Sequence, residues 1–406
     1  MLRKRIYLDY ASTTPLDESV LKAMLPCFGK KFGNASSIHA EGVEAKKILD
    51  TARRNVARLL QAREREIIFT SGGTESNNLA IFGTVNATAK SDKRRTNTVW
   101  RGMHIVTTNI EHSSVLEPIR ELERRGVSVT YVPVEPNGIV DANKIGAALR
   151  PDTVLVSIGY ANNEIGTIQP ILKIAKFIRD FQNRRLKILN FKLKTVKNRL
   201  PIFHSDGSQA PLYLNCNVSR LGVDLLTLDG HKMYGPKGVG LLYVKNGVNI
   251  SPIIFGGGQE RGLRSTTENI PLIVGLSKAF EIASKYREKE SKRLTSLRDY
   301  CYSSVLQNTG MEIVVNGSME NGQRLPNNIN ISIPGLDVEF ATLKLDVSGI
   351  ACSTKSSCLG SGGGSYVVRA LGKGEARALS TLRFTFGRDT TKSDIEYLLK
   401  VLAKIT

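Results

Sequence analysis

The chain has 406 residues, of which 41% are hydrophobic and 23% are charged. These fractions are typical of a globular protein with a substantial core and exclude an intrinsically disordered chain. No stretch approaches the roughly 18 continuous apolar residues of a membrane helix. The basic start, residues 1–5, is followed by too short an apolar run for a secretory signal. We therefore expect a cytoplasmic protein without membrane association, built from one large and one smaller domain.

A net charge of +20 favours acidic partners. Much of the excess lies in two basic stretches, 90–101 and 184–200. Neither stretch has the interleaved aromatic residues of single-strand nucleic-acid binders, so we interpret both first as solvated surface segments. In a second interpretation they dock an acidic partner, and for 184–200 we expect an acidic scaffold protein or a transfer RNA.

The cysteines are few and scattered: Cys27, Cys216, Cys301, Cys352 and Cys358. An odd and widely spaced set of this kind implies no disulfide framework. There is no CxxC pair, which argues against a zinc site. We therefore expect no resident metal ion.

The first two thirds of the chain alternate between predicted strands and helices. The predicted strands are 66–70, 104–107, 127–134, 153–160, 202–205 and 225–228, and the clearest helices are 74–82 and 113–125. This alternation predicts an α/β fold with a mainly parallel sheet that is covered on both faces. Ligands of such sheets bind at the carboxyl ends of the strands.

The pattern changes after residue 272. A long amphipathic helix is predicted over 273–298, strands over 312–315 and 328–333, and a last helix from Lys392 onward. These elements are typical of a smaller α+β domain. We place the large domain at 15–270 and assemble the small domain from 1–14 and 271–406.

Two charged residues follow predicted strands, at the edge where a ligand is expected. Lys232 lies in a glycine-flanked turn after strand 225–228 and is a candidate Schiff-base nucleophile. Asp206 follows strand 202–205, and a carboxylate there suits the ring nitrogen of a pyridoxal cofactor. Taken singly, Lys232 could be a surface charge and Asp206 a helix N-cap. The two together favour a pyridoxal site.

Other strand ends carry polar groups that extend this interpretation. Gly73 and Thr74 lie at a strand-to-helix turn, where backbone N–H groups and the helix N-terminus attract a phosphate. His112 follows strand 104–107 and suits contact with a cofactor ring or proton transfer near neutral pH. Helix capping and a structural histidine are the plainer alternatives.

Several segments resemble cysteine desulfurases of the iron–sulfur-cluster type, which are pyridoxal-phosphate enzymes of the class V aminotransferase family. The segments are 7–15, 32–39, 70–78, 111–112, 162–166, 205–209, 230–232, 256–265 and 365–372. They follow one another in order over nearly the whole chain. The resemblance implies the aspartate-aminotransferase-like fold type I of pyridoxal enzymes, with a homodimer that shares its active sites.

The resemblance also implies a role for each matching residue. Lys232 would hold pyridoxal 5′-phosphate, Asp206 would pair with its ring nitrogen, Gln209 would contact the ring hydroxyl and His112 would stack on the ring. The residues implied at the cofactor also include Asn163 and, at its phosphate, Gly73, Thr74, His231 and, from the second subunit, Thr267. Arg383 would bind the substrate carboxylate with help from Asn34 and Asn163.

The segment 347–354 resembles the family loop that carries the sulfur acceptor, and it selects Cys352. The thiolate of Cys352 would take sulfur from L-cysteine as a persulfide and release L-alanine, and then pass the sulfur to an iron–sulfur scaffold, another acceptor protein or transfer-RNA thiolation. Cys352 is also a candidate transient ligand of an iron–sulfur cluster. The glycine-rich run 359–365 favours a mobile loop.

Three features depart from the family pattern. Asp229 occupies a position that is usually small and hydroxylated and that contacts phosphate, so it puts one phosphate contact in doubt. Cys358 follows Cys352 in a longer loop than the family has, and the two basic stretches look like insertions. The alternatives are a selenocysteine lyase, another pyridoxal β-lyase, or a silent scaffold or nucleic-acid binder. The presence of Lys232, Asp206 and Cys352 disfavours the last.

Overall fold

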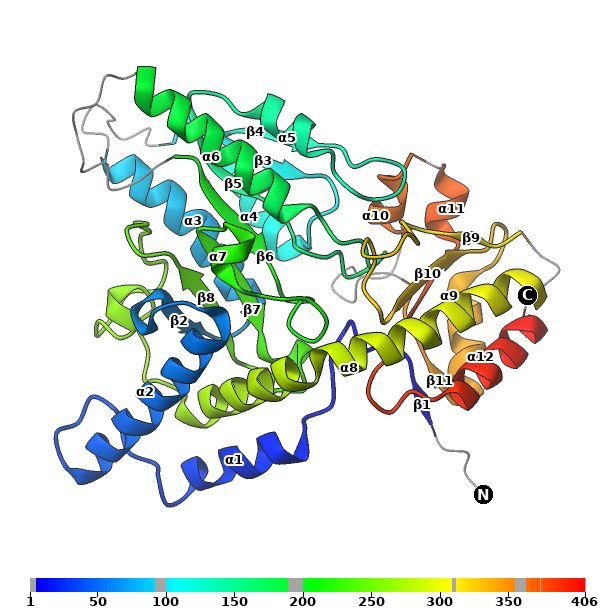
Figure 1. Cartoon of the computed structure of the whole chain (residues 1–406), viewed down its shortest axis with the longest axis horizontal. Coiled ribbons are helices and arrows are strands. Elements are labelled where there is room, and N and C mark those ends of the chain that lie inside the picture. The colour runs from blue at the N-terminus through cyan, green and yellow to red at the C-terminus, as the bar shows by residue number, and fades with distance from the viewer. Residues whose placement is uncertain are drawn as a thin grey trace.

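The computed structural model describes residues 5–91, 100–188, 200–308, 312–354, 363–372 and 374–405. Its centre is a seven-stranded sheet in the order β2-β8-β7-β6-β5-β3-β4 (Figure 1). The strands are β2 (Ile67–Thr70), β3 (His104–Thr108), β4 (Ser128–Val132), β5 (Thr153–Ser157), β6 (Ile202–Asp206), β7 (Leu225–Asp229) and β8 (Gly240–Val244). The run from β7 to β4 is parallel, and β8 is antiparallel to both its neighbours. The predicted α/β class is confirmed.

The predicted strands are present, but their ends differ. Glu66 belongs to the turn Glu64–Glu66 and not to β2, because its carboxylate accepts the N–H of Arg63. Strands β4 and β5 end at Val132 and Ser157, before the ends that the sequence predicted. The sequence analysis missed β8, whose residues are buried throughout. Its residues are as apolar as those of the buried parallel strands, so the pattern would have allowed the strand to be predicted but not its direction.

Helices cover both faces of the sheet and bury two separate apolar cores. One core packs the sheet against α1 (Glu18–Phe28), α2 (Ala40–Leu60), α5 (Ala142–Ala148), α6 (Ile171–Ile188) and α7 (Val218–Leu221). The other core packs the opposite face against α3 (Gly73–Ser91) and α4 (Ser113–Arg124). This double cover is what a buried parallel sheet requires.

Helix α8 (Ile270–Asn308) runs from the large sheet to the C-terminal part of the chain (Figure 1). It is longer at both ends than the predicted helix 273–298. Its C-terminal half continues because Leu294, Cys301 and Val305 recur on one face and enter a third apolar core. One helix therefore contributes to two of the three cores.

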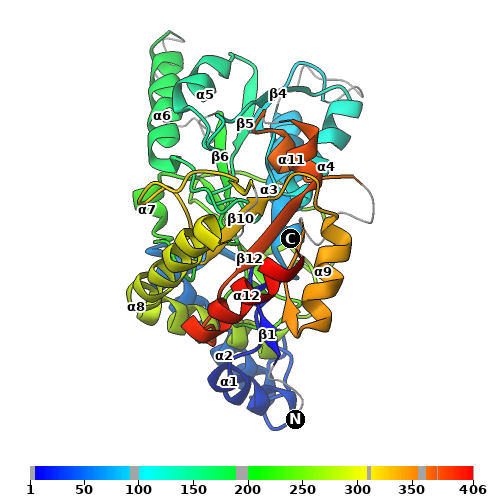
Figure 2. The same ribbon diagram turned by 90° about the vertical axis from the view of Figure 1, so that its right-hand side faces the viewer.

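The C-terminal part holds a three-stranded antiparallel sheet in the order β12-β10-β9. Its strands are β9 (Val314–Val315), β10 (Asn328–Ser332) and β12 (Thr381–Thr385). Helices α8, α9 (Val338–Val347) and α12 (Lys392–Ile405) pack against it through the third core (Figure 2). Two short helices, α10 (Tyr366–Arg369) and α11 (Glu375–Leu379), precede β12.

The start of the chain belongs to this C-terminal part. Strand β1 (Ile6–Tyr7) pairs in parallel with β11 (Ile350–Ala351), and Thr385 N–H donates to Leu8 O. The division of the chain at residues 14 and 270 stays a prediction. Among the described residues, none of the helices combines the length and apolar character of a membrane span.

Candidate active site

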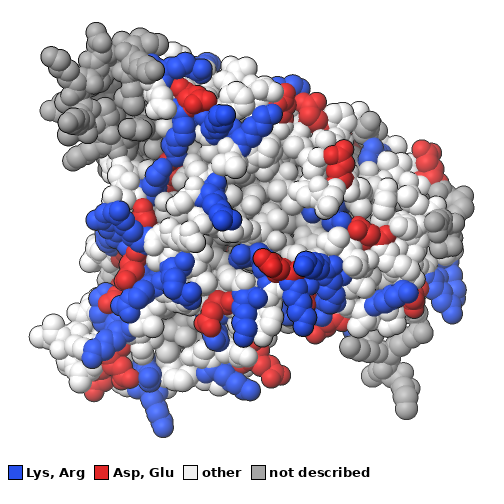
Figure 3. Space-filling view, viewed as in Figure 1, with Lys and Arg blue, Asp and Glu red and all other residues white. Residues whose placement is uncertain are grey.

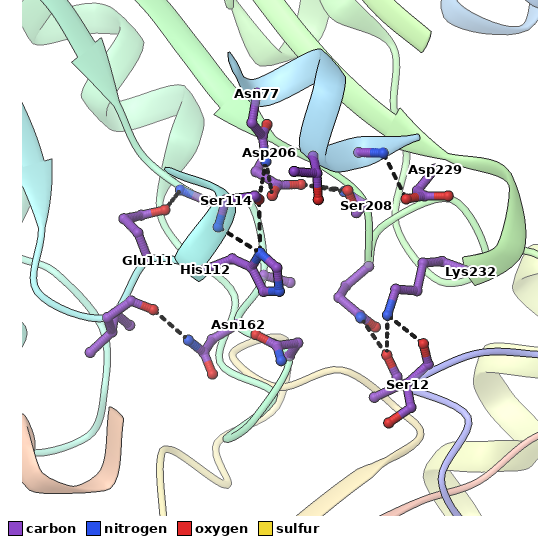
Figure 4. Close-up of a pocket in the computed structure, with 18 of the residues that line it drawn as sticks. Ser12, Asn77, Glu111, His112, Ser114, Asn162, Asp206, Ser208, Asp229 and Lys232 are labelled. Carbon is purple, nitrogen blue, oxygen red and sulfur yellow. Dashed lines mark hydrogen bonds between the residues drawn. The ribbon is translucent and has the colours of Figure 1, made fainter. Parts of the chain in front are cut away.

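A cavity with about 950 Å³ of empty space, part of it open to solvent, lies at the carboxyl ends of β5, β6 and β7 (Figure 4). This is the edge where the alternation of strands and helices in the sequence predicted a ligand. Most of the predicted site residues line it: Gly73, Thr74, His112, Asn163, Asp206, Gln209, His231, Lys232 and Arg383. Asn34, Thr267 and Cys352 are not among its lining residues.

Lys232 closes the short turn Gly230–Lys232 that follows β7. Its Nζ donates to the carbonyl oxygens of Ala11 and Ser12, at 2.6 and 2.7 Å. Gln209 Nε2 donates to the same Ala11 oxygen at 2.9 Å. The segment after β1 therefore orients both predicted cofactor residues, a connection that the sequence did not reveal.

Asp206 is the last residue of β6, and its carboxylate is held from two sides. Asn77 Nδ2 donates to it at 2.8 Å, and the N–H and Oγ of Ser208 donate at 2.9 and 2.6 Å. Asn77 Nδ2 also donates to Ser114 Oγ at 2.8 Å, and that oxygen lies 2.8 Å from His112 Nδ1. A continuous hydrogen-bonded chain therefore links His112 to Asp206 (Figure 4).

Glu111 precedes His112 and is buried. Its carboxylate accepts hydrogen bonds from Thr108 Oγ1 at 2.6 Å and from the N–H of Gly159 at 2.8 Å. Burial raises the pKa of Glu111 to about 8, and the charge of Asp206 adds to this shift. Glu111 is thus mostly protonated at neutral pH and fixes the turn after β5 beside the cavity.

The predicted phosphate cradle lies at the start of α3, and Asp229 reaches into it. The N–H of Gly73 donates to Asp229 Oδ2 at 2.7 Å, and the N–H of His231 approaches Oδ1 at 3.3 Å. His231 Nε2 lies 3.5 Å from Oδ2. Burial alone would raise the pKa of Asp229, but His231, the Gly73 N–H and Lys232 together hold it below its usual value. The carboxylate does not turn away from the predicted phosphate ligands.

Arg383 lies on β12 with a side chain that is 1% exposed. Its Nη2 donates to Asp9 Oδ1 at 2.7 Å and to Ser12 Oγ at 3.0 Å, and its Nη1 donates to Asn163 O at 3.0 Å. Its Nε is buried and has no hydrogen-bond partner among the described residues. Arg383 lines the cavity, and its planar guanidinium suits an incoming carboxylate.

Cys352 follows β11 beside the strand that carries Arg383. Ser353 and Arg383 exchange both backbone hydrogen bonds, at 3.2 and 2.6 Å. Burial raises the pKa of the Cys352 thiol to about 12, and the charge of Asp9 adds to the effect. Cys358 and most of both basic stretches lie outside the described residues. No group of His, Cys, Asp and Glu suited to a metal ion occurs in the parts of the chain that the structure describes.

The family model for class V aminotransferases matches residues 6–188 and 191–398. The chain is 42% identical to the cysteine desulfurase IscS of Dictyoglomus turgidum, over 100% of this chain and 95% of that protein. It is 40% identical to the putative cysteine desulfurase IscS 1 of Bacillus subtilis, over 99% and 98% of the two chains. The chain belongs to the cysteine desulfurases of the class V aminotransferase family. The predicted family is confirmed.

Solved structures agree with this placement. A NifS-like protein superposes on this cysteine desulfurase with a TM-score of 0.85 and 34% identity, covering 99% of both chains. A structure described as SspA in complex with cysteine gives a TM-score of 0.76 and 32% identity over 94% of this chain and 98% of the other. The predicted fold type I is thereby confirmed.

Members of this family depend on pyridoxal phosphate, and most of the cavity fits that cofactor. It combines a lysine amine, a strand-end carboxylate and the N-terminus of α3. Asn77 Oδ1 is buried at the cavity wall and has no hydrogen-bond partner among the described residues. The exception is Asp229, which takes a donor that the phosphate would use.

Besides Cys352, two predicted residues of the desulfurase site, Asn34 and Thr267, lie apart from the cavity lining. Asn34 is exposed in the loop between α1 and α2, where its Oδ1 accepts the N–H of Ser36 at 2.9 Å. Thr267 lines a different hollow, formed with Thr70 and Arg264. The sequence analysis missed Asn77 and Ser114 as hydrogen-bond partners, although Asn77 lies within a segment that carried the resemblance.

Proposed function

We propose that this protein removes the sulfur of L-cysteine, using Lys232 and Arg383 to hold the substrate against its cofactor and Cys352 to accept the sulfur. One observation carries the proposal: the cavity brings Lys232, Asp206 and Arg383 together, and Ser353, next to Cys352, is hydrogen-bonded to Arg383. Each group supplies one requirement of the reaction. An ordinary binding pocket has no need of this combination.

The cofactor would be held by Lys232 through its amine, by Asp206 at the ring nitrogen and by His112 at the ring face. Bound there, pyridoxal phosphate supplies an electron-withdrawing ring that acidifies the substrate Cα–H. Asn77 and Ser208 donate hydrogen bonds to the carboxylate of Asp206 and orient it toward the cavity. The Ser114–Asn77 bridge fixes His112 relative to Asp206.

The remaining steps belong to side chains of this chain. Arg383 binds the substrate carboxylate through its guanidinium, whose Nη2 also donates to Asp9. The amine of Lys232 removes the Cα proton and later returns it. The Cys352 thiolate attacks the substrate sulfur atom and forms a sulfur–sulfur bond, and the electron pair of the broken carbon–sulfur bond passes to Cβ. Cβ takes up a proton of the kind that the thiol gave up, so the products are L-alanine and a persulfide on Cys352.

A homodimer would complete the site. Several large apolar side chains are exposed, among them Phe32 at 73%, Ile38 at 97% and Phe255 at 77%. Exposed apolar groups of this size favour a protein partner. We propose that a second copy covers them and brings its Thr267 toward the first copy's cavity.

The sulfur would then pass to an acceptor protein such as an iron–sulfur scaffold, with transfer RNA as a second acceptor. On the face shown in Figure 3, basic residues are spread widely and interspersed with acidic ones. Among the described residues, the face in Figure 3 does not concentrate its basic side chains in a single bounded patch. The net charge of +20 favours an acidic partner. A cytoplasmic location fits such a partner and is part of the proposal.

An absorption spectrum of the purified protein tests the proposal. A band at about 390–420 nm that shifts with L-cysteine, followed by alanine in equimolar amount to transferred sulfur, is the expected result. A colourless protein that stays colourless with added pyridoxal phosphate would contradict it. Parallel assays with selenocysteine and with other β-substituted amino acids separate a desulfurase from a lyase of broader substrate range.

A further inference from the structure

Asp229 is a carboxylate placed where the cofactor's phosphate is expected. It accepts the Gly73 N–H at 2.7 Å, and the same N–H opens helix α3. It also lies 3.5 Å from His231 Nε2, the second predicted phosphate ligand. Two of the groups expected to bind phosphate are therefore already engaged by a residue of the chain.

The space beside Asp229 that a phosphate would occupy is also small. A Cβ atom on Gly73 would come within 3.0 Å of Asp229 Oδ2 and within 3.1 Å of Ser208 Oγ. The carboxylate thus lies directly against the backbone of the helix N-terminus. A phosphate that approaches the Gly73 N–H meets a like charge at van der Waals distance, which opposes its binding.

We propose that Asp229 competes with the cofactor's phosphate for the Gly73 N–H and for His231, so that this chain discriminates poorly between pyridoxal 5′-phosphate and unphosphorylated pyridoxal. The inference rests on the cofactor site described under Proposed function. Asp229 in this role sets cofactor specificity and does not take part in the reaction.

The neutral 5′-hydroxymethyl group of pyridoxal meets Asp229 differently. A hydroxyl is a hydrogen-bond donor, and a buried carboxylate is a good acceptor. The phosphate ester has only acceptor oxygens when it is fully ionised. Asp229 therefore stabilises the smaller vitamer and penalises the phosphorylated one, while all contacts to the ring are the same for both.

The comparison of the two compounds isolates the phosphate. Both carry the same aldehyde for Lys232 and the same ring for Asp206 and His112. The ratio of their dissociation constants therefore cancels any general effect of a substitution on the cavity. Asp229→Asn removes the charge and keeps an acceptor for the Gly73 N–H, and Asp229→Ser places a small hydroxyl there.

Equilibrium dialysis of the full chain, freed of bound cofactor, measures both dissociation constants. We expect the preference for pyridoxal phosphate over pyridoxal to rise about tenfold or more in Asp229→Asn and Asp229→Ser. Asp50→Asn, an exposed carboxylate on α2 that pairs with Lys46, serves as the control and leaves the ratio unchanged. If the preference for pyridoxal phosphate over pyridoxal is unchanged or lower in both Asp229 variants, the inference is overturned. The proposed function still stands in that case, because the cofactor binds.

A second measurement needs no variant. Inorganic phosphate at about 10 mM should not raise the melting temperature of the cofactor-free native chain, because Asp229 already accepts the Gly73 N–H that a phosphate would use. A clear rise that pyridoxal phosphate abolishes would contradict the competition. Failure of both pyridoxal and its phosphate to bind any of the chains would overturn the proposed function along with this inference.

Discussion

The guanidinium of Arg383 and the carboxylate of Asp9 form a partly buried ion pair, with Nη2 and Oδ1 2.7 Å apart. The two residues are 374 positions apart in the chain. Strand β12 brings them together, because Asp9 forms a bridge to Thr385 of that strand. A substrate carboxylate at Arg383 therefore has to share the guanidinium with Asp9.

We predict that Arg383→Lys raises the KM for L-cysteine by about 10- to 100-fold. Lysine keeps the charge but loses the planar set of donors that a carboxylate binds. Steady-state alanine formation measures this. Arg388→Lys is a suitable control, since Arg388 pairs with Asp17 outside the cavity, and an equal rise in KM there would contradict the assignment.

Asp9→Asn should speed alkylation of Cys352 at a fixed pH. The charge of Asp9 is the second cause, after burial, that raises the pKa of this thiol. Removing it lowers that pKa and increases the thiolate fraction. Iodoacetamide labelling, followed by peptide mass spectrometry, gives the rate. No change, or a slower rate, would show that Asp9 does not act on Cys352.

The native enzyme should respond strongly to pH at the same thiol. With a pKa of about 12, Cys352 is protonated at neutral pH, and its thiolate fraction rises about tenfold per pH unit up to that pKa. We expect the rate of Cys352 alkylation to follow this slope between pH 7 and pH 10. A rate that is already flat from pH 7 would contradict the raised pKa of this thiol.

Lys232→Ala should reduce alanine formation by about a thousandfold or more, since it removes the proposed proton carrier and the attachment of the cofactor. Borohydride should then fail to fix pyridoxal phosphate to the protein. Lys237→Ala is the matched control, because Lys237 is an exposed lysine five residues further along the chain. If Lys237→Ala also lost alanine formation and borohydride fixation of the cofactor, the effect would come from a disturbed turn and not from the amine of Lys232.

Glu111 should make stability depend on pH. Its pKa rises from 4.5 to about 8 on folding, so its contribution to stability is fully present below pH 4.5 and is lost as the pH rises through 8. Glu111→Gln lacks this dependence. Urea unfolding gives the free energy of unfolding at pH 5 and at pH 8, and it should fall more between these pH values in the native chain than in the variant. An equal fall in both would contradict the raised pKa of Glu111.

Local patterns predicted much of the site. Lys232 and Asp206 stand out because each follows an apolar strand of a parallel sheet, where side chains meet at one edge. The chain from His112 through Ser114 and Asn77 to Asp206 could not be predicted, because it depends on how α3 and α4 lie side by side on one face. Such contacts join residues that no spacing rule connects.

The pairings of short strands were equally hidden. Strands β1 and β11 have two residues each, which is too short for a periodic signal. Their pairing fixes Asp9 beside Arg383 and places Cys352 at the end of β11. Asp229 is the opposite case: the sequence marked it as unusual, but only the structure shows that it accepts the Gly73 N–H.

The central claim is that sulfur from the substrate becomes bound to Cys352. A single turnover with L-cysteine and no reductant, followed by peptide mass spectrometry, tests it directly. We expect one added sulfur atom on the Cys352 peptide and one alanine per active site, and neither in Cys352→Ser. Cys27→Ser, a buried cysteine of α1, should behave as the native chain. Alanine formed by Cys352→Ser at the native rate, or sulfur found on another cysteine first, would contradict the account.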